Sequence, residues 1–498
     1  MLYTSTRDKS VKVESAQAIA TGISAEGGLF VPTEIPQISI DEISSLTNLS
    51  YIERAKHILS YFLTDFTKEE LAWCVEGAYG DNKFSSVDVA PVHTLREGEE
   101  ILELWRGPTC AFKDMALQLL PRLMTVSVKK TAGDQETVIL VATSGDTGKA
   151  ALEGFKDVEG TRILVFYPVD GVSPMQKLQM TTQEGKNVSV CAIEGNFDDA
   201  QTGVKRIFTD KKIGEKLKEH GMAFSSANSI NWGRLVPQIV YYFSAYCDLL
   251  KKNKIKAGDK INIVVPTGNF GNILAAYYAY KMGMPVNKFI CASNKNKVLT
   301  DFFHTGVYDV NRSFYTTSSP SMDILISSNL ERLLFLASDY DDAFVRDMMA
   351  KLKNDGKYEI PTEIKAEIDS MFTSGCCDDE GTKATINEVY NKYNYLCDTH
   401  TAVAVNVYEN YVEETKDETP TVIASTANPF KFSSSVLDAV KKNGAEGLDE
   451  FSIVDALANE TKESCPAQLA NLQDKKVRFT KVCTKDSMEN VVFELLGI

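Results

Sequence analysis

From about residue 100, short apolar segments alternate with segments of helical periodicity, and this alternation constrains the fold more than any other feature of the sequence. The apolar segments are residues 137–142, 162–167, 187–193, 260–265 and 288–293. Helical patterns lie between them at residues 148–156, 198–209 and 273–282. Continuously apolar strands are buried on both faces, as in parallel sheets covered by helices. The sequence therefore predicts an α/β fold with parallel-rich sheets flanked by helices.

Two regions depart from this alternation. Residues 1–95 combine turn signals with amphipathic stretches, which predicts a separate N-terminal α/β domain. Residues 337–397 are charged and have helical periodicity, so we expect a helical insertion there. The α/β pattern resumes at about residue 400.

The charge and composition narrow the classes of partner. The 498 residues include 68 acidic and 53 basic side chains, which gives a net charge of −15. Such a chain repels nucleic acid and anionic lipid, and no apolar run approaches the ~20 residues of a membrane span, so we expect neither partner. Ten scattered cysteines indicate reduced thiols in a cytoplasmic protein. The five histidines never fall at metal-ligand spacing, and no metal site is expected.

The segment PTGNFGN, residues 266–272, lies between an apolar strand and a helix. A turn of this kind aims several backbone N–H groups at one point, and the helix dipole adds positive potential there. Gly268 and Gly271 have no Cβ atom, so an anion can approach the backbone closely. The expected ligand is a phosphate group, and the alternative is a tight turn without a ligand. The segment is neither a Walker A loop nor G-x-G-x-x-G, which argues against a nucleotide-binding module.

A second turn, TSGDTG at residues 143–148, also lies between a strand and a helix. Its hydroxyl groups and backbone amides are suited to a carboxylate ligand. The alternative is a helix cap formed by Asp146 or Thr147.

The segment GPTCAFKD, residues 107–114, places Lys113 at the start of a helical stretch among apolar neighbours. Burial disfavours the charged form of the amine, which makes it nucleophilic. The alternative is an ordinary surface lysine.

Two further polar segments are candidates for ligand binding. ANSINWGR, residues 227–234, precedes a long helix, and its Arg234 can bind a phosphate group through two hydrogen bonds, with Asn228 and Asn231 as amide donors. The alternative is helix capping beside a solvated arginine. STANPF, residues 425–430, follows a buried strand at the end where open α/β sheets bind ligands.

Together these segments provide a phosphate cup, a reactive lysine and a hydroxyl group for a ring nitrogen, which are the groups that pyridoxal phosphate needs. The sequence resembles the threonine synthase family in its N-terminal residues 5–32 and in six further segments, which are GPTCAFKD, TSGDTG, ANSINWGR, PTGNFGN, SPSMDILISSNLERLLF and STANPFKF. The resemblance extends to about residue 435. It is to the longer branch of the family, found in fungi and many bacteria.

The resemblance implies a fold type II pyridoxal-phosphate enzyme similar to the β subunit of tryptophan synthase. A smaller cofactor domain at residues 96–235 would carry the Schiff-base lysine and the TSGDTG loop. A larger one at residues 236–498 would carry the phosphate turn and include the helical insertion.

The resemblance also assigns individual residues. Lys113 matches the family's Schiff-base lysine, and Thr426 matches the residue that hydrogen-bonds the pyridine nitrogen. The cofactor phosphate loop is matched by Gly268, Asn269, Phe270, Gly271 and Asn272. The substrate-binding positions are matched by Ser144, Gly145, Asp146, Thr147, Asn228 and Arg234, with Ser229 and Asn231 as further candidates. The stretch at residues 398–401 is also similar to the family, and we expect helix capping by Asp398 or Thr399 there.

The implied activity is that of a carbon–oxygen lyase acting on a phosphate ester, with Lys113 as general base. O-phospho-L-homoserine and water would give L-threonine and phosphate, the final step of threonine biosynthesis. One alternative is another lyase, dehydratase or phospholyase of the same fold. A second is a non-catalytic amino-acid-binding paralogue, in which the lysine or the phosphate loop would be expected to be lost. The sequence is compatible with a monomer or a homodimer.

Overall fold

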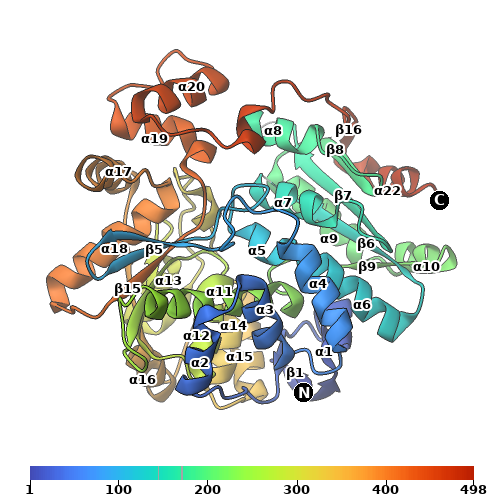
Figure 1. Ribbon diagram of the computed structural model, residues 1–498. Helices are drawn as coiled ribbons and strands as arrows, with labels where there is room; N and C mark the ends of the chain where they lie inside the picture. Colours follow the sequence, from blue (N-terminus) through green and yellow to red (C-terminus); the bar gives the residue numbers. More distant parts are fainter. Residues whose placement is uncertain (144, 170–171) are drawn as a thin grey trace.

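The computed structural model describes residues 1–143, 145–169 and 172–498, arranged around two large sheets (Figure 1). The predicted α/β fold is confirmed. Among the described residues, no helix combines the length and the apolar character needed to cross a bilayer.

The N-terminal region contains a small antiparallel sheet and four helices. Its strands, in the order β2-β1-β3, are β1 (Tyr3–Ser5), β2 (Asp8–Val13) and β3 (Phe30–Pro32). Its helices are α1 (Ser15–Thr21), α2 (Ile40–Ser45), α3 (Tyr51–Ser60) and α4 (Lys68–Tyr79). Capping boxes start α3 and α4, where Ser50 and Thr67 each exchange hydrogen bonds with a glutamate three residues later.

A five-stranded parallel sheet has the order β16-β8-β7-β6-β9. Its strands are β6 (Glu136–Ala142), β7 (Thr161–Pro168), β8 (Val188–Glu194), β9 (Met222–Ser225) and β16 (Val482–Thr484). The helices associated with it are α5 (Lys113–Leu117), α6 (Leu120–Ala132), α7 (Asp146–Phe155), α8 (Pro174–Thr181), α9 (Phe197–Thr209), α10 (Lys211–Glu219) and α22 (Met488–Leu496).

A six-stranded sheet has the order β14-β11-β10-β15-β5-β4 and is parallel except for the β4–β5 pair. Its strands are β4 (Val92–Arg96), β5 (Glu99–Glu103), β10 (Ile261–Pro266), β11 (Val286–Ser293), β14 (Phe372–Cys376) and β15 (Thr421–Ser425). The helices associated with it are α11 (Trp232–Lys251), α12 (Gly271–Lys281), α13 (Val298–Thr305), α14 (Leu330–Ala337) and α18 (Thr399–Thr415).

Further elements lie outside these sheets and their helices. They are β12 (Val307–Asp309), α15 (Asp342–Asp355), β13 (Lys357–Glu359), α16 (Thr362–Met371), α17 (Asp379–Tyr393), the 3-10 helix η3 (Pro429–Phe432), α19 (Ser433–Val440), α20 (Glu450–Thr461) and α21 (Ala467–Ala470).

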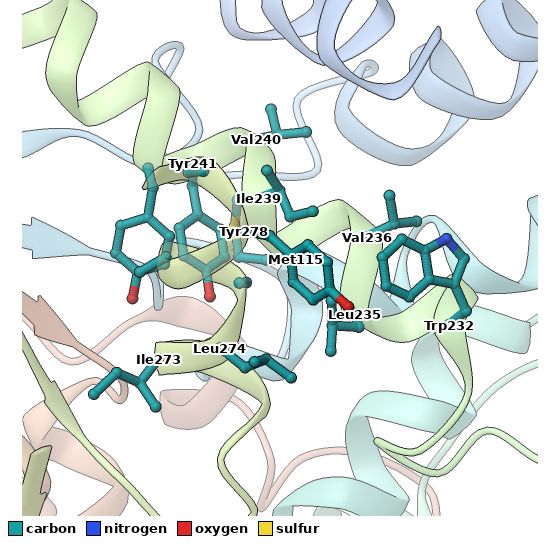
Figure 2. Packing of buried hydrophobic residues seen from close by; sticks show 14 of the residues in the cluster. Met115, Trp232, Leu235, Val236, Ile239, Val240, Tyr241, Ile273, Leu274 and Tyr278 are labelled. Carbon is teal, nitrogen blue, oxygen red and sulfur yellow. The ribbon is translucent and has the colours of Figure 1, made fainter. Parts of the chain in front are cut away.

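The main hydrophobic core forms around α11, which is buried along most of its length (Figure 2). The ring of Trp232 at its start lies 5.4 Å from that of Tyr3 and 5.3 Å from that of Tyr278, centroid to centroid. These contacts join the N-terminal sheet, α11 and α12. The N-terminal region is therefore packed into the same core as the large sheet.

The predicted helical insertion at residues 337–397 is wrong in part. The helices α15, α16 and α17 are present, but β13 pairs with β12, and β14 pairs in parallel with β11. Because β14 is the edge strand of the six-stranded sheet, this region belongs to the main fold.

The predicted boundaries at residues 95/96 and 235/236 do not coincide with the division between the sheets. β5 follows residue 96 but pairs with β15 in the six-stranded sheet. β16, near residue 483, pairs with β8 in the five-stranded sheet. The second boundary falls inside α11.

Candidate active site

A cavity of about 840 Å³ lies where the carboxyl ends of β6, β10 and β15 approach one another. The predicted site residues among those lining it are Lys113, Thr147, Asn228, Ser229, Arg234, Gly268, Asn269, Phe270, Gly271, Asn272 and Thr426. Gly145, Asp146 and Asn231 are not part of the lining. Ser144 lies outside the described residues.

The backbone conformation of the turn after β10 depends on the residues at positions 268 and 270. Phe270, directly before α12, adopts the left-handed conformation with φ of 65°. A Cβ atom on Gly268 would lie 2.6 Å from the carbonyl oxygen of Ser321, so only glycine fits there without a shift of the backbone. A side chain held in a strained conformation requires support from its surroundings. Here the ring of Phe270 packs against Phe303 and Phe372 of β14, each with centroids 6.0 Å apart.

Two carbonyl groups of this turn accept hydrogen bonds from neighbouring side chains. The Ser327 hydroxyl donates to the Gly268 carbonyl oxygen at 2.7 Å, and the Asn329 amide side chain donates to the Asn269 carbonyl oxygen at 2.9 Å. Within the described part of the chain, the N–H groups of Gly268, Asn269 and Phe270 have no hydrogen-bond acceptor. These free donors stand at the start of α12 and form an anion-binding cup.

Asn272 adds an unused donor to this cup. Its Oδ1 accepts a hydrogen bond from the Tyr242 hydroxyl, while its buried Nδ2 has no partner among the described residues. A buried amide donor without a partner is costly, so an acceptor bound in the cup would satisfy it.

Lys113 opens α5 and lines the same cavity. The Phe112 N–H donates to the Thr426 carbonyl oxygen at 2.8 Å, which ties the lysine segment to the end of β15. The Lys113 side chain is 9% exposed, and its Nζ donates to the Ser321 hydroxyl at 3.2 Å. Burial lowers the pKa of Lys113 from 10.5 to about 8, although the nearby Asp146 carboxylate opposes the shift. The amine is therefore partly neutral near pH 8.

The cap at the start of α7 differs from the one expected, which was a cap formed by Asp146 or Thr147. The Thr143 hydroxyl, and not Asp146 or Thr147, accepts hydrogen bonds from the N–H groups of Gly145 and Gly148, both at 3.0 Å. Thr147 reaches the cavity.

Asp146 lies behind the lining and forms an ion pair with Lys431 of η3 at 2.8 Å. Both side chains are nearly fully buried. Burial alone would raise the pKa of Asp146, but the ammonium groups of Lys431 and Lys113 outweigh it and hold that pKa far below its usual range. Lys431 lies in the STANPFKF segment, but no pattern in the sequence identifies its partner.

Arg234 is a buried cation of the cavity lining. It is 7% exposed, donates to the Ala227 carbonyl oxygen at 2.8 Å, and has a pKa lowered to about 10 by burial. Asn228 and Ser229 also line the cavity. The exposed Lys205 of α9 is a further cation of the lining, and it lies outside the motifs recognised in the sequence.

Asn231 does not reach the cavity, because its side chain is used elsewhere. Its Oδ1 accepts from the Gly233 N–H at 2.9 Å, and its Nδ2 donates to the carbonyl oxygens of Ile19 and Ser226, both at 3.0 Å. The residue caps α11 and ties it to the end of α1.

A buried arginine connects three of the segments that carry the family resemblance. Arg332 donates to the Phe30 carbonyl oxygen at 3.0 Å, to the Ile230 carbonyl oxygen at 2.6 Å and to the Asn329 side chain. Since Asn329 holds the phosphate turn, the segment at residues 319–335 acts as the support of the site. The family resemblance alone assigns this segment no role.

Comparison with known proteins agrees with this arrangement. The family described as "Threonine synthase N terminus" matches residues 2–79, "Pyridoxal-phosphate dependent enzyme" matches residues 102–350, and "Threonine synthase, C-terminal" matches residues 401–492.

Individual relatives cover most of the chain. Human threonine synthase-like 1 is 42% identical over 86% of this chain, which spans only 58% of the length of that protein. Threonine synthase from Pseudomonas aeruginosa is 37% identical over 95% of this chain and 97% of its own length. A crystal structure of threonine synthase from Brucella melitensis with PLP bound superposes with a TM-score of 0.88 at 36% identity, covering 99% of each chain. The chain belongs to the threonine synthase family of pyridoxal-phosphate-dependent enzymes, and its fold is fold type II.

Proposed function

We propose that this protein is a threonine synthase, which converts O-phospho-L-homoserine and water into L-threonine and phosphate. The observation that carries the proposal is a single cavity lined by a buried lysine, an anion cup of free backbone donors and a buried arginine. A substrate with an amino group at one end and a phosphate group at the other suits these features.

The residues fit the cofactor. The free N–H groups at residues 268–270 and the unpartnered Nδ2 of Asn272 would hold the phosphate group of pyridoxal phosphate. The Lys113 amine would carry its aldehyde carbon, and the Thr426 hydroxyl would face the ring nitrogen. When bound, pyridoxal phosphate supplies an electron-withdrawing ring that makes the C–H bonds of an attached amino acid acidic.

Lys113 is the proposed general base. Its pKa of about 8 leaves part of the amine neutral at physiological pH, so it can take the proton from Cα of the substrate and return it later. A residue with this pKa can serve in both directions because neither protonation state is strongly favoured.

Arg234 would hold the phosphate group of the substrate before and after it leaves Cγ, with donors from Asn228 and Ser229 beside it. We leave Asn231 out of this role, because its polar atoms already have partners. Thr147 and the N–H groups of its loop would bind the substrate carboxylate, and the part of Ser144 rests on the family resemblance alone.

We further propose that the enzyme acts in the cytoplasm, since eight of its ten cysteines are buried and all ten are free thiols. The oligomeric state that we propose is a monomer or a homodimer.

The test is to load the purified protein with pyridoxal phosphate and to measure phosphate and threonine release from O-phospho-L-homoserine. L-Serine and L-threonine serve as competing substrates for a dehydratase of the same fold. We expect equal amounts of phosphate and threonine, and no turnover by Lys113→Ala. Lys129→Ala is the matched control, because Lys129 is an exposed residue of α6. Faster turnover of serine, or an active Lys113→Ala, would contradict the proposal.

A further inference from the structure

Asp398 and His400 form a buried pair at the start of α18. Asp398 is fully buried and His400 is 2% exposed, with His400 Nδ1 and Asp398 Oδ1 2.9 Å apart. The His400 ring belongs to the lining of the cavity. Neither residue has a part in the reaction as proposed above.

The hydrogen bonds around the ring define which nitrogen carries the proton. The backbone N–H of Ser321 donates to His400 Nε2 at 3.1 Å, so Nε2 must be unprotonated. The proton therefore resides on Nδ1, which donates to Asp398. Asp398 also accepts from the backbone N–H of His400 at 2.8 Å and from the Thr401 hydroxyl. The ring is thus held in one orientation.

Ser321, on the other side of the ring, contacts two parts of the active site. Its hydroxyl accepts the hydrogen bond from Lys113 Nζ at 3.2 Å. Its carbonyl oxygen would lie only 2.6 Å from a Cβ atom on Gly268, so it packs closely against the phosphate turn. A shift of Ser321 would therefore move the partner of the lysine and the wall of the anion cup together.

Helix capping accounts for Asp398 but not for the imidazole of His400. The carboxylate of Asp398 bonds the first N–H groups of α18, and this cap needs no particular side chain at residue 400. The ring instead spans the distance from the cap to Ser321, with the edge of the Phe432 ring packed against it.

We propose that His400 is a positioning residue that acts through Ser321 on Lys113. The imidazole holds the Ser321 backbone so that its hydroxyl accepts one N–H of the free lysine amine. The nitrogen lone pair then stays available for the proton at Cα of the substrate. This inference rests on the proposed function, because it assigns a role in positioning the same general base.

The test compares His400→Leu, which removes the acceptor for Ser321, with His400→Gln, whose side-chain oxygen can replace it. Ser321→Ala and the double variant with His400→Leu complete the cycle. His304→Leu is the matched control, because His304 is an exposed histidine of α13.

Two rates are measured. The first is the rate at which pyridoxal phosphate attaches to Lys113 in the cofactor-free protein, followed by the absorbance of the bound cofactor. The second is kcat, together with KM, for O-phospho-L-homoserine. We expect His400→Leu and Ser321→Ala each to lower both rates by about tenfold, which is the size of coupling found between residues in direct contact. His400→Gln should stay within about threefold of the wild type, and KM should change little in every variant. The double variant should be no slower than the slower single variant, because both changes disrupt the same hydrogen bond to the amine.

Losses that multiply in the double variant, or a His400→Leu protein with the wild-type attachment rate, would overturn the proposal. Should His400→Leu fail to fold, His400→Asn replaces it, because asparagine can still donate to Asp398 but is too short to reach Ser321. The attachment rate needs no substrate. A chain that is inert toward O-phospho-L-homoserine would therefore refute the proposed function and leave this test decisive.

Discussion

The two turns that face the cavity are both strand-to-helix connections, but they are held in different ways. The turn between β10 and α12 is supported by neutral side chains and by the backing segment at residues 319–335. In the loop between β6 and α7, Asp146 pairs with Lys431 of η3, which follows β15 of the other sheet. The first arrangement builds the anion cup within one sheet. The second depends on a buried pair of charges that joins the two sheets, so the loss of one partner leaves the other charge buried and uncompensated.

Removal of the support behind the phosphate turn should have the largest effect. In Arg332→Met three acceptors lose their donor, two of them buried and one partly buried. Each unpaired acceptor costs ~1–3 kcal/mol, so we expect the free energy of unfolding to fall by about 5 kcal/mol. Affinity for pyridoxal phosphate should fall as well. Arg346→Met is the control, because Arg346 is half exposed and its ion pair should contribute under ~1 kcal/mol. Denaturant unfolding of the cofactor-free proteins measures the difference. Equal effects of the two changes would show that Arg332 does not support the turn.

Loss of the ion pair between Asp146 and Lys431 should have the next largest effect on stability. It should act on the loop between β6 and α7. Lys431→Met leaves the Asp146 carboxylate buried without its partner, which should lower the free energy of unfolding by about 4 kcal/mol. Lys441→Met removes an exposed lysine of the same region and should have little effect. In the double variant with Asp146→Asn, most of the loss should be recovered. No recovery would mean that the charge of Asp146 is not the cause, and the contrast between the turns would then lose its basis.

A smaller effect is expected from Lys113, whose burial should make the stability of the protein depend on pH. The pKa of Lys113 is about 8 in the folded chain, against an ordinary value of 10.5 that we take for the unfolded chain. Below pH 8 both states carry the ammonium group, and the folded state bears the full cost of burying it, at most about 3 kcal/mol. Between pH 8 and 10.5 the folded chain binds fewer protons than the unfolded one, so this cost diminishes as the pH rises.

Cofactor-free Lys113→Met should therefore be more stable than the wild type at pH 7, and its advantage should shrink between pH 8 and 10.5. Thermal unfolding of both proteins across this range measures the change. An advantage that is constant with pH would show that burial of the charge is not the source of the low pKa.

Sequence patterns predicted the elements whose burial is evident along the chain. The apolar runs at residues 137–142, 162–167 and 260–265 are β6, β7 and β10, with ends that differ by at most one residue. β14 and β16 were missed, because edge strands are only half buried and contain no continuous apolar run.

The same limit applies to the site. The motifs around Lys113, Gly268 and Arg234 lie in contiguous segments, and the sequence analysis selected all three. Lys431 and His400 act through partners far away in the chain, and a contact of this kind leaves no local pattern. Asn231 shows the converse case, in which a polar side chain in a binding segment is used for capping.

The pairing of β16 with β8 has a consequence for synthesis on the ribosome. Residues 195–481 are translated after β8 and before β16, so the edge of β8 stays uncovered during most of the production of the chain. An open parallel edge is prone to association with other nascent chains. Early release of the polypeptide before residue 484 would leave that edge permanently unprotected, even though every residue that lines the cavity had already been made.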